Sequence, residues 1–261
     1  MAVLGVDVGS LSAKAVIVEH GKVVVSAIIG VKPTPVQSAR EVTEAVLESA
    51  NLRMVDIDYC VSTGYGRAII PFANKSISEI SCHGKGAHWS ESSVRGIIDI
   101  GGQDCKAITV DESGDLVDFT MNDKCAAGTG RFLEIVARTL GVDITELGEL
   151  GCEGEEPIPI SNRCSVFAEY EILLLLAEGR DVGAIGAGAN EAMAKRAFAL
   201  TRKIKCNSAV TVTGGVAKNR GVKRNLERLL QSEVIDLPHD PQIMGALGAA
   251  LFAQQNYQRG L

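Results

Sequence analysis

The sequence predicts an α/β protein built from two related lobes, chiefly because one pattern occurs twice. Residues 6–16 read VDVGSLSAKAV and residues 98–108 read IDIGGQDCKAI. Each copy has a β-branched strand, an Asp-x-Gly at which the chain must turn, and a second strand with Lys and Ala at matched positions. No low-complexity linker separates the halves. We therefore expect packed lobes, 1–93 and 94–240, with a ligand cleft between them. A C-terminal helix at about 241–261 is expected to pack back on the first lobe.

The first lobe begins with a predicted three-stranded meander. Its strands are expected at 3–8, 13–19 and 22–29, with a turn at His20-Gly21. Pro33 and Pro35 break the chain before a helix over 36–50, where apolar residues recur at helical spacing. A strand over 59–62 then leads into Thr63-Gly64-Tyr65-Gly66-Arg67.

The second lobe repeats the meander, with its turn at residues 112–115, and then becomes mostly helical. The expected helices cover 131–140, 143–147, the stretch from Cys164 to about 178, and 182–203. The chain ends in alternating elements: strand 208–213, Gly214-Gly215, helix 219–230, strand 233–236 and helix 244–254. This alternation is typical of α/β proteins.

Composition and charge exclude several classes of protein. Apolar residues make up 46% and charged residues 22% of 261, which are ordinary globular proportions. The net charge is −6 and no basic run occurs, so we expect no nucleic-acid partner. The longest apolar stretch, 243–253, is shorter than the roughly 20 residues that span a membrane. The N-terminus lacks the features of a signal peptide, so we expect a cytoplasmic protein without membrane attachment.

The two Asp-x-Gly turns are suited to a Mg²⁺-nucleotide. Glycine lets backbone N–H groups approach phosphate, and a carboxylate holds hydrated Mg²⁺ through oxygen ligands. Asp7, Asp99 and Gln103 are the catalytic candidates, with the two aspartates organising Mg²⁺ and its water. The nucleotide-contact candidates are Ser10, Leu11, Ser12, Ala13, Lys14, Gly101, Gly102, Asp104, Gly214, Gly215 and Gln242. Lys14 and Lys106 could offset phosphate charge, or could simply be solvated strand lysines.

A third glycine turn, Gly214-Gly215, lies between a predicted strand and a predicted helix. Alone it could be an ordinary tight turn that needs a positive φ. Together with the turns after Asp7 and Asp99 it completes a set: two turns that approach phosphate and one that approaches the nucleoside. The set favours nucleotide binding over three unrelated turns.

Cysteine usage is the second chemical signal. Seven cysteines, an odd number, argue against a disulfide framework. Cys125 and Cys164 each precede a predicted helix and follow a cation, Lys124 or Arg163, and a helix N-terminus favours a thiolate. The alternative is that both are buried thiols. The remaining cysteines are interpreted as structural, and the loose ligand-like group of Cys82, His83 and His88 as part of an ordinary loop or helix.

Thiolates at helix starts could act as nucleophiles or as metal ligands. A nucleophile needs a base, and none of the four histidines falls in either cysteine motif. A four-iron four-sulfur cluster needs four thiolates, and a homodimer that contributes Cys125 and Cys164 from each copy would supply them.

The chain resembles a known family, the activator components of 2-hydroxyacyl-CoA dehydratases, within a wider group that includes ATP-binding subunits of benzoyl-CoA reductases. The motifs that carry the resemblance are 7–10 (DVGS), 63–67 (TGYGR), 99–104 (DIGGQD), 124–130 (KCAAGTG), 164–169 (CSVFAE), 213–217 (TGGVA) and 245–250 (GALGAA). They cover nearly the whole chain. Leu11 and Ala13 depart from the family pattern, because hydroxyl residues are frequent at these two positions in relatives. The second loop keeps Gly102-Gln103-Asp104, which favours a competent ATPase.

The resemblance implies the two-lobed fold of actin, Hsp70 and sugar kinases. It implies a homodimer that holds one 4Fe-4S cluster between subunits, with Cys125 and Cys164 as ligands. The implied activity is ATP-driven transfer of one low-potential electron, received from a donor such as ferredoxin or flavodoxin, to an iron–sulfur dehydratase. ATP-driven lobe closure would move the helices after both cysteines.

Other functions stay open at this stage. The partner could instead be a benzoyl-CoA reductase-type or double-cubane protein. A small-molecule kinase of the same fold would explain the glycine turns but would leave the two cysteines without a role. An Hsp70-like nucleotide-sensing module would bind partners without redox activity, although the sequence shows no substrate-binding β-domain.

Overall fold

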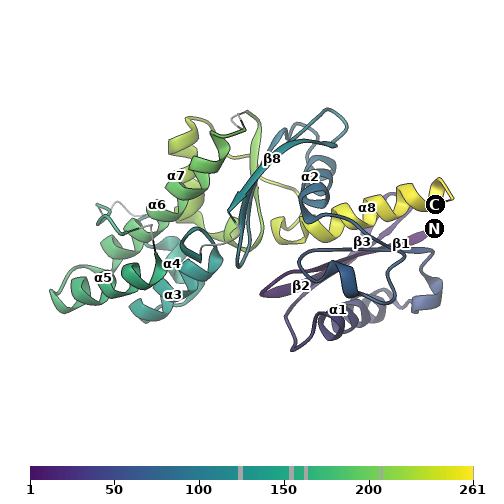
Figure 1. The fold of residues 1–261 in the computed structure, drawn as a ribbon, viewed down its shortest axis with the longest axis horizontal. Helices are drawn as coiled ribbons and strands as arrows, with labels where there is room; N and C mark the ends of the chain where they lie inside the picture. The colour runs from purple at the N-terminus through teal and green to yellow at the C-terminus, as the bar shows by residue number, and fades with distance from the viewer. Residues whose placement is uncertain (123–125, 153–155, 162–163, 205, 207, 261) are drawn as a thin grey trace. The chain divides into compact units, whose positions relative to one another are not determined.

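The computed structural model describes residues 1–122, 126–152, 156–161, 164–204, 206 and 208–260. The chain divides into two compact units (Figure 1). Unit 1 comprises Met1–Arg95, Val110–Val117 and Leu237–Leu261, and unit 2 comprises Gly96–Thr109 and Asp118–Asp236. Each unit is built around its own sheet.

Unit 1 contains a five-stranded sheet in the order β3-β2-β1-β4-β5. Its strands are β1 (Ala2–Val8), β2 (Ser12–Glu19), β3 (Lys22–Gly30), β4 (Tyr59–Thr63) and β5 (Lys75–Ser76). The first three form the predicted antiparallel meander, and β4 runs parallel to β1. β1 is buried along its whole length because it is central in the sheet and covered on both faces.

Helices cover the two faces of this sheet (Figure 1): α1 (Pro35–Ala50) on one and α8 (Met244–Gln258) on the other. Leu4 and Val6 pack toward Val42 of α1, whereas a side chain at Gly5 would meet the backbone of α8, as strand alternation requires. α1 begins where Thr34 accepts a hydrogen bond from the backbone of Gln37. A further helix, α2 (Glu79–Ser90), packs along α8. Short 3₁₀ turns occur at Met54–Asp56 (η1), Arg67–Ile69 (η2) and Pro241–Ile243 (η5).

Unit 2 repeats this topology with a sheet in the order β8-β7-β6-β9. Its strands are β6 (Gly96–Ile100), β7 (Cys105–Val110), β8 (Leu116–Asn122) and β9 (Val210–Thr213). β6 and β7 are antiparallel, and β9 is parallel to β6, as β4 is to β1. The strand predicted over 233–236 is reduced to one bridge between Ile235 and Thr211, because only one residue there meets the edge of the sheet.

The helical part of unit 2 follows the predicted order. It consists of α3 (Gly130–Leu140), α4 (Ile144–Glu149), α5 (Ser165–Ala177), α6 (Val182–Thr201) and α7 (Arg220–Leu230), with 3₁₀ turns η3 (Ala126–Gly128) and η4 (Gly215–Lys218). Their apolar faces form one core with the sheet, in which Phe132, Ile172 and Met193 are fully buried beside Ile98. Within the described part of the chain, every helix is too short or too polar to cross a membrane.

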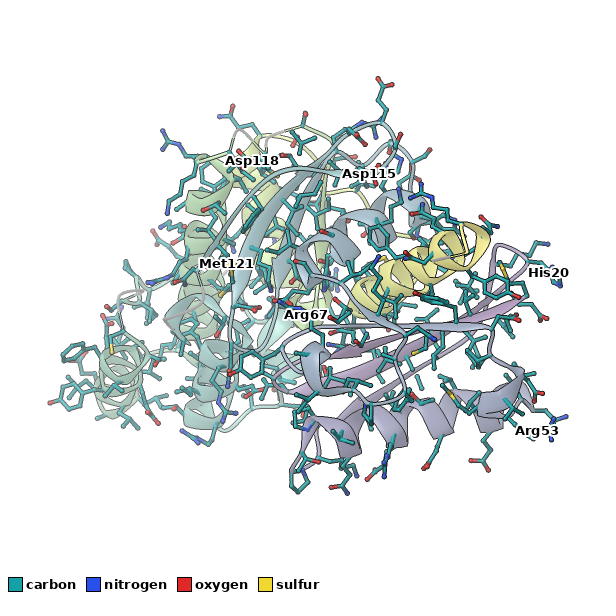
Figure 2. All side chains as sticks on the ribbon, turned by 45° about the vertical axis from the view of Figure 1, so that its right-hand side comes forward. His20, Arg53, Arg67, Asp115, Asp118 and Met121 are labelled. Carbon is teal, nitrogen blue, oxygen red and sulfur yellow. The ribbon has the colours of Figure 1, made fainter. Side chains whose placement is uncertain are left out.

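The β7–β8 hairpin contributes to both units. Its tip, Val110–Val117, belongs to unit 1, where Lys85 Nζ on α2 donates to the Ser113 carbonyl (2.7 Å) and to Asp115 Oδ1 (2.9 Å). Figure 2 labels Asp115 at this tip and Asp118 and Met121 farther along β8. The strand ends at Asn122, shortly before Cys125.

Candidate functional site

Each unit places an aspartate and a lysine of the repeated pattern side by side. In unit 1, Asp7 at the end of β1 pairs in register with Lys14 on β2, with 3.4 Å between Nζ and Oδ2. In unit 2, Asp99 pairs in register with Lys106 on β7, with 3.3 Å between the corresponding atoms. Both carboxylates are nearly buried, at 4% and 3% exposure. The repeat in the sequence is therefore a repeat of one charged pair in three dimensions.

The neighbouring parallel strand adds a threonine and a glycine to each pair. Thr63 on β4 lies opposite Asp7, and Thr213 on β9 lies opposite Asp99. Thr213 Oγ1 donates to Asp99 Oδ1 (3.0 Å), whereas Thr63 Oγ1 donates to the carbonyl of Ile77 (2.8 Å). The threonine of unit 2 therefore bonds to the carboxylate, whereas the corresponding threonine of unit 1 bonds to the backbone of Ile77.

Gly64 and Gly214 follow these threonines with φ of +85° and +84°. A Cβ at Gly64 would lie 2.3 Å from Asp7 Oδ1, and one at Gly214 would lie 2.9 Å from Asp99 Oδ1 and 2.4 Å from the Ile100 carbonyl oxygen. Any side chain would displace the carboxylate in addition to straining the backbone. Gly214 thus needs its positive φ, and it also lies against the predicted catalytic aspartate.

The two lysines differ in their surroundings. Lys106 is only 2% exposed and contacts a second carboxylate, Asp104 Oδ1, at 2.7 Å. The Lys14 side chain is 12% exposed. The interpretation of these lysines as simply solvated is wrong, because both are held against carboxylates. The carboxylate of Asp104, a predicted nucleotide contact, is engaged with Lys106.

Both Asp-x-Gly turns are two-residue hairpin loops. The backbone N–H of Gly9 donates to Ser12 O (3.1 Å), and that of Gly101 donates to Asp104 O (3.0 Å). Ser10, Leu11 and Ser12 are partly exposed in the first loop, and Gln103 is exposed in the second. The side chain of Ala13 lies in the core of unit 1, and the residue pairs in register with Val8 of β1 and Ile29 of β3.

The second loop is also bonded to a helix. The N–H groups of Gly130 and Arg131, at the start of α3, donate to the carbonyls of Gly101 (2.8 Å) and Gly102 (3.1 Å). Sequence reasoning missed this link, because nothing local relates the two segments. It ties the predicted phosphate loop to the helix that begins shortly after Cys125.

Two other predicted nucleotide contacts lie in 3₁₀ turns. Gly215 opens η4, directly after Gly214. Gln242 lies in η5, where its backbone N–H donates to Asp240 Oδ1 (2.8 Å).

The cysteines fall into two groups. Burial raises the pKa of the Cys60 and Cys82 thiols to about 12 and that of Cys206 to about 11, and it raises the pKa of Cys105 further. Such thiols stay protonated and serve as core residues. Cys152 is half-buried, and its thiol donates to the Gly148 carbonyl.

Cys164 differs, because it is the half-buried N-cap residue of α5 and its thiol makes no capping hydrogen bond. Its predicted position at a helix start is confirmed. Cys125 lies outside the described residues. Among the residues that are described, no group of three or more His, Cys, Asp or Glu side chains could by itself hold a metal ion.

An apolar stripe on α5 begins two residues after Cys164. We define the α5 face by its large exposed residues: Val166 (69%), Phe167 (69%), Tyr170 (62%), Leu173 (52%) and Leu174 (47%). Ala168 and Ile172, on the opposite side of the helix, are in the core. Exposed apolar surface of this kind is a feature of protein–protein contacts.

Sequence comparison agrees with this arrangement. Residues 4–253 match the BadF/BadG/BcrA/BcrD ATPase family. The chain belongs to that family. A member from Anaerotignum propionicum, the activator of lactoyl-CoA dehydratase, is 45% identical over 99% of this chain and 100% of its own length. A benzoyl-CoA reductase subunit from Thauera aromatica is more distant, at 31% identity over 86% of this chain and 81% of its own.

Two solved structures of family members superpose on the chain with a TM-score of 0.94 each. One is the activator of the 2-hydroxyisocaproyl-CoA dehydratase from Clostridium difficile with bound ADPNP, at 41% identity, covering 100% of this chain and 97% of that one. The other is component A of the Acidaminococcus fermentans (R)-2-hydroxyglutaryl-CoA dehydratase, at 40% identity and 99% coverage of both chains.

A more remote likeness concerns the fold alone. A ROK family glucokinase from Streptomyces griseus is 13% identical, with a TM-score of 0.58 over 98% of this chain and all of that one. The predicted α/β fold of the sugar-kinase and actin type is confirmed.

Proposed function

We propose that this chain hydrolyses ATP and uses the hydrolysis to transfer one low-potential electron to a partner iron–sulfur enzyme, a 2-hydroxyacyl-CoA dehydratase. The observation that carries the proposal is Cys164 at the N-terminus of α5, in a chain that also has two Asp-Lys hairpin sites. The full-length relatives named as dehydratase activators support the same reaction.

In this proposal the two hairpins bind the phosphates of the nucleotide and its Mg²⁺. Asp7 and Asp99 would organise Mg²⁺, and their nearly buried carboxylates are the hard oxygen donors that this ion prefers. Bound Mg²⁺ would supply charge neutralisation for the phosphates. The loop residues Ser10, Ser12, Gly101, Gly102 and Gln103 would approach the phosphates and the attacking water, and Gly214, Gly215 and Gln242 the nucleoside. Positioning and charge stabilisation account for most of the catalysis of such hydrolysis.

The donor set fits an iron–sulfur cluster that is shared by two copies of the chain. Cys164 is half-buried at the N-terminus of α5, and its thiol is not used for capping, so it is available as a ligand. Cys125 and Cys164 of each copy would give the four thiolates that a 4Fe-4S cluster requires. Such a cluster, when bound, supplies the single electron.

A homodimer follows from this ligand count. A cluster held equally by two copies lies on their symmetry axis, so the first turn of α5 lies close to the axis. The exposed apolar residues in that turn, Val166 and Phe167, are suited to contact with the second copy.

The coupling of hydrolysis to electron transfer has a direct route in unit 2. If the loop from Gly101 to Asp104 has two conformations, a phosphate that binds one of them more tightly shifts the equilibrium toward that conformation. The hydrogen bonds from Gly130 and Arg131 would pass this shift to the start of α3. This route adds to the lobe closure expected from the resemblance. A ferredoxin or flavodoxin donor and a cytoplasmic location, where thiols stay reduced, complete the proposal.

The alternative partner is a benzoyl-CoA reductase-type or double-cubane protein. The 31% identity to a benzoyl-CoA reductase subunit supports it, but less strongly than the 45% identity to a dehydratase activator.

The test is anaerobic purification of Cys125→Ala and Cys164→Ala, with Cys152→Ala as the matched control. We expect both ligand variants to lose iron and the visible iron–sulfur absorption while they still bind ADP, and the control to keep its colour. Full retention of the absorption in either ligand variant would rule out the ligand assignment. A colourless wild-type protein whose ADP production depends on a small-molecule substrate would instead indicate a kinase.

A further inference from the structure

The loop Thr63-Gly64-Tyr65-Gly66-Arg67 has no role in the function proposed so far. It leaves β4 at the residue opposite Asp7, so it starts at the edge of the sheet where the first Asp-x-Gly hairpin turns. A loop in this position is well placed to contact what Asp7 contacts.

The loop is fixed against the end of β1 at several points. The N–H of Gly66 donates to the Val8 carbonyl (2.9 Å), and Ser62 Oγ donates to the Arg67 carbonyl (2.9 Å). Gly64 lies against the Asp7 carboxylate, as described above. The backbone of Arg67 is therefore held at a set distance from Asp7, which preorganises its side chain.

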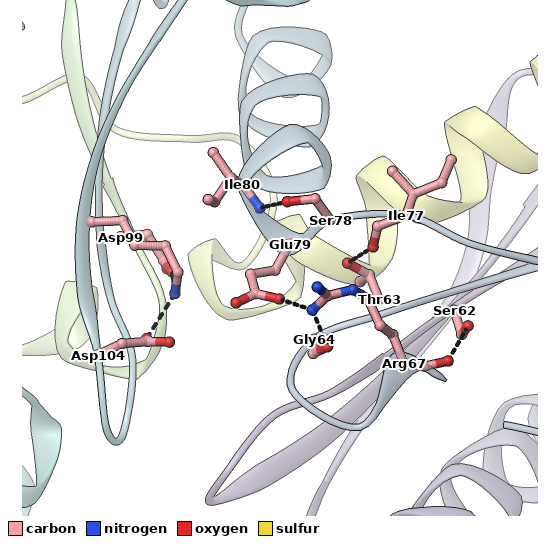
Figure 3. A network of polar contacts seen from close by, with 11 residues as sticks. Ser62, Thr63, Gly64, Arg67, Ile77, Ser78, Glu79, Ile80, Asp99 and Asp104 are labelled. Atoms are coloured by element: carbon pink, nitrogen blue, oxygen red, sulfur yellow. Dashed lines mark hydrogen bonds and ion pairs between the residues drawn. The ribbon is translucent and has the colours of Figure 1, made fainter. Parts of the chain in front are cut away.

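The guanidinium of Arg67 is held between the loop and the start of α2. Its Nη1 donates to the Gly64 carbonyl (3.0 Å) and to Glu79 Oε2 at the start of α2 (2.8 Å), as Figure 3 shows. Gly64 thus touches the Asp7 carboxylate and accepts a bond from the arginine. The charges of Asp7, Glu79 and Arg67 all act on one buried group, the thiol of Cys82.

Burial distinguishes this ion pair from a surface contact. The Glu79 side chain is 18% exposed, and that of Arg67 is 39% exposed. Arg67 is therefore anchored through Nη1 while its side chain stays partly open to solvent. Its planar, always charged fork suits phosphate oxygens.

We propose that Arg67 binds the terminal phosphate of the nucleotide, and that Glu79 holds its guanidinium in place when no nucleotide is bound. This inference rests on the proposed ATPase activity. In the reaction, the oxygen of a water molecule bonds to the terminal phosphorus, the bond to the bridging oxygen of ADP breaks, and a water proton passes to the released phosphate or to solvent. Arg67 keeps its proton and stabilises the charge on the transferring phosphoryl group.

A purely structural role is the competing explanation, in which the Arg67–Glu79 pair only ties the loop to α2. The two roles differ in one variant. Glu79→Gln breaks the ion pair but keeps the guanidinium, so a structural role predicts that it matches Arg67→Gln. A phosphate-binding role predicts that Glu79→Gln keeps most of its activity.

The experiment compares Arg67→Gln, Arg67→Lys and Glu79→Gln as full-length, cluster-loaded protein under anaerobic conditions. Arg53→Gln is the control, because Arg53 is an exposed arginine elsewhere in unit 1 that pairs with Asp56 (Figure 2). The measurements are kcat and KM for ATP, the affinity for ADP, and trapping of ADP with aluminium fluoride, which imitates the transferring phosphoryl group.

We expect Arg67→Gln to lower kcat by a factor of about 100 or more and to abolish trapping, with ADP affinity within about threefold of wild type. Arg67→Lys should recover part of kcat, whereas Glu79→Gln and Arg53→Gln should trap ADP normally. Equal losses in Arg67→Gln and Glu79→Gln, or normal trapping by Arg67→Gln, would overturn the inference. A wild-type protein without ATPase activity would refute the proposed function instead.

Discussion

Replacing Gly214 with alanine should damage the Asp99 site far more than the same change at Gly141. Gly214 has φ of +84° and ψ of −179°, a region that is essentially restricted to glycine and costs other residues about 1–3 kcal/mol. The new Cβ would also lie 2.4 Å from the Ile100 carbonyl oxygen and 2.9 Å from Asp99 Oδ1. Relieving that overlap moves Asp99 away from Thr213, and a hydrogen bond to a charged group contributes about 1.5–3 kcal/mol.

Gly141 provides the matched control. It too has a positive φ, +72°, but with ψ of 26° it lies in the ordinary left-handed region, and a Cβ there would meet no atom within 4 Å. Gly141→Ala therefore carries only the backbone cost, about 1–2 kcal/mol. We expect Gly214→Ala to lose about 3–5 kcal/mol.

The assay is urea unfolding without nucleotide, followed by calorimetric titration with Mg²⁺-ADP. Gly214→Ala should bind ADP at least about tenfold more weakly, which corresponds to about 1.4 kcal/mol, and Gly141→Ala should bind it normally. The reasoning is refuted if the two variants have the same free energy of unfolding and the same ADP affinity.

Two further predictions concern buried charge and buried thiols. Lys106→Met should destabilise the protein by about 3–5 kcal/mol, because it removes the cation that lies against both Asp99 and Asp104. Lys14→Met should cost less, because Lys14 contacts one carboxylate and is more exposed. Urea unfolding measures both variants, and a larger loss for Lys14→Met would contradict this reasoning. Burial raises the pKa of the Cys60 and Cys82 thiols from 9.0 to about 12, so these thiols ionise at lower pH in the unfolded chain than in the folded protein. The free energy of unfolding should therefore be independent of both thiols well below pH 9 and should fall as the pH rises from 9 to about 12. The difference between wild type and Cys60→Ser across that range checks it, and a difference that does not change with pH would count against it.

Local sequence was enough to predict the two hairpins and the position of their aspartates, but not the Asp–Lys ion pairs. The strands that carry Asp7 and Lys14 are joined by a two-residue loop, so the hairpin needs no distant contact to bring these residues into register. The helix start at Cys164 could also be predicted from the sequence, because the start of a helix depends on residues that are close together in the chain.

Features that depend on distant segments could not be predicted from the sequence. Nothing local indicates that Thr213 donates to Asp99, because a parallel strand pairing more than a hundred residues away sets that contact. The strand predicted over 233–236 was wrong in extent, since strand length depends on the neighbour available at the edge. The buried position of Lys106 likewise follows from what packs around it.

The sequence by itself thus determined the two hairpins, their carboxylates and the cysteine at the start of α5, because turns, caps and alternation act over a few residues. Only the tertiary structure decided that Lys106 is buried between two carboxylates, that α3 is bonded to the second loop, and that Arg67 is bonded to Glu79 at the start of α2. These contacts join segments that are far apart in the chain, and packing of the whole fold selects them.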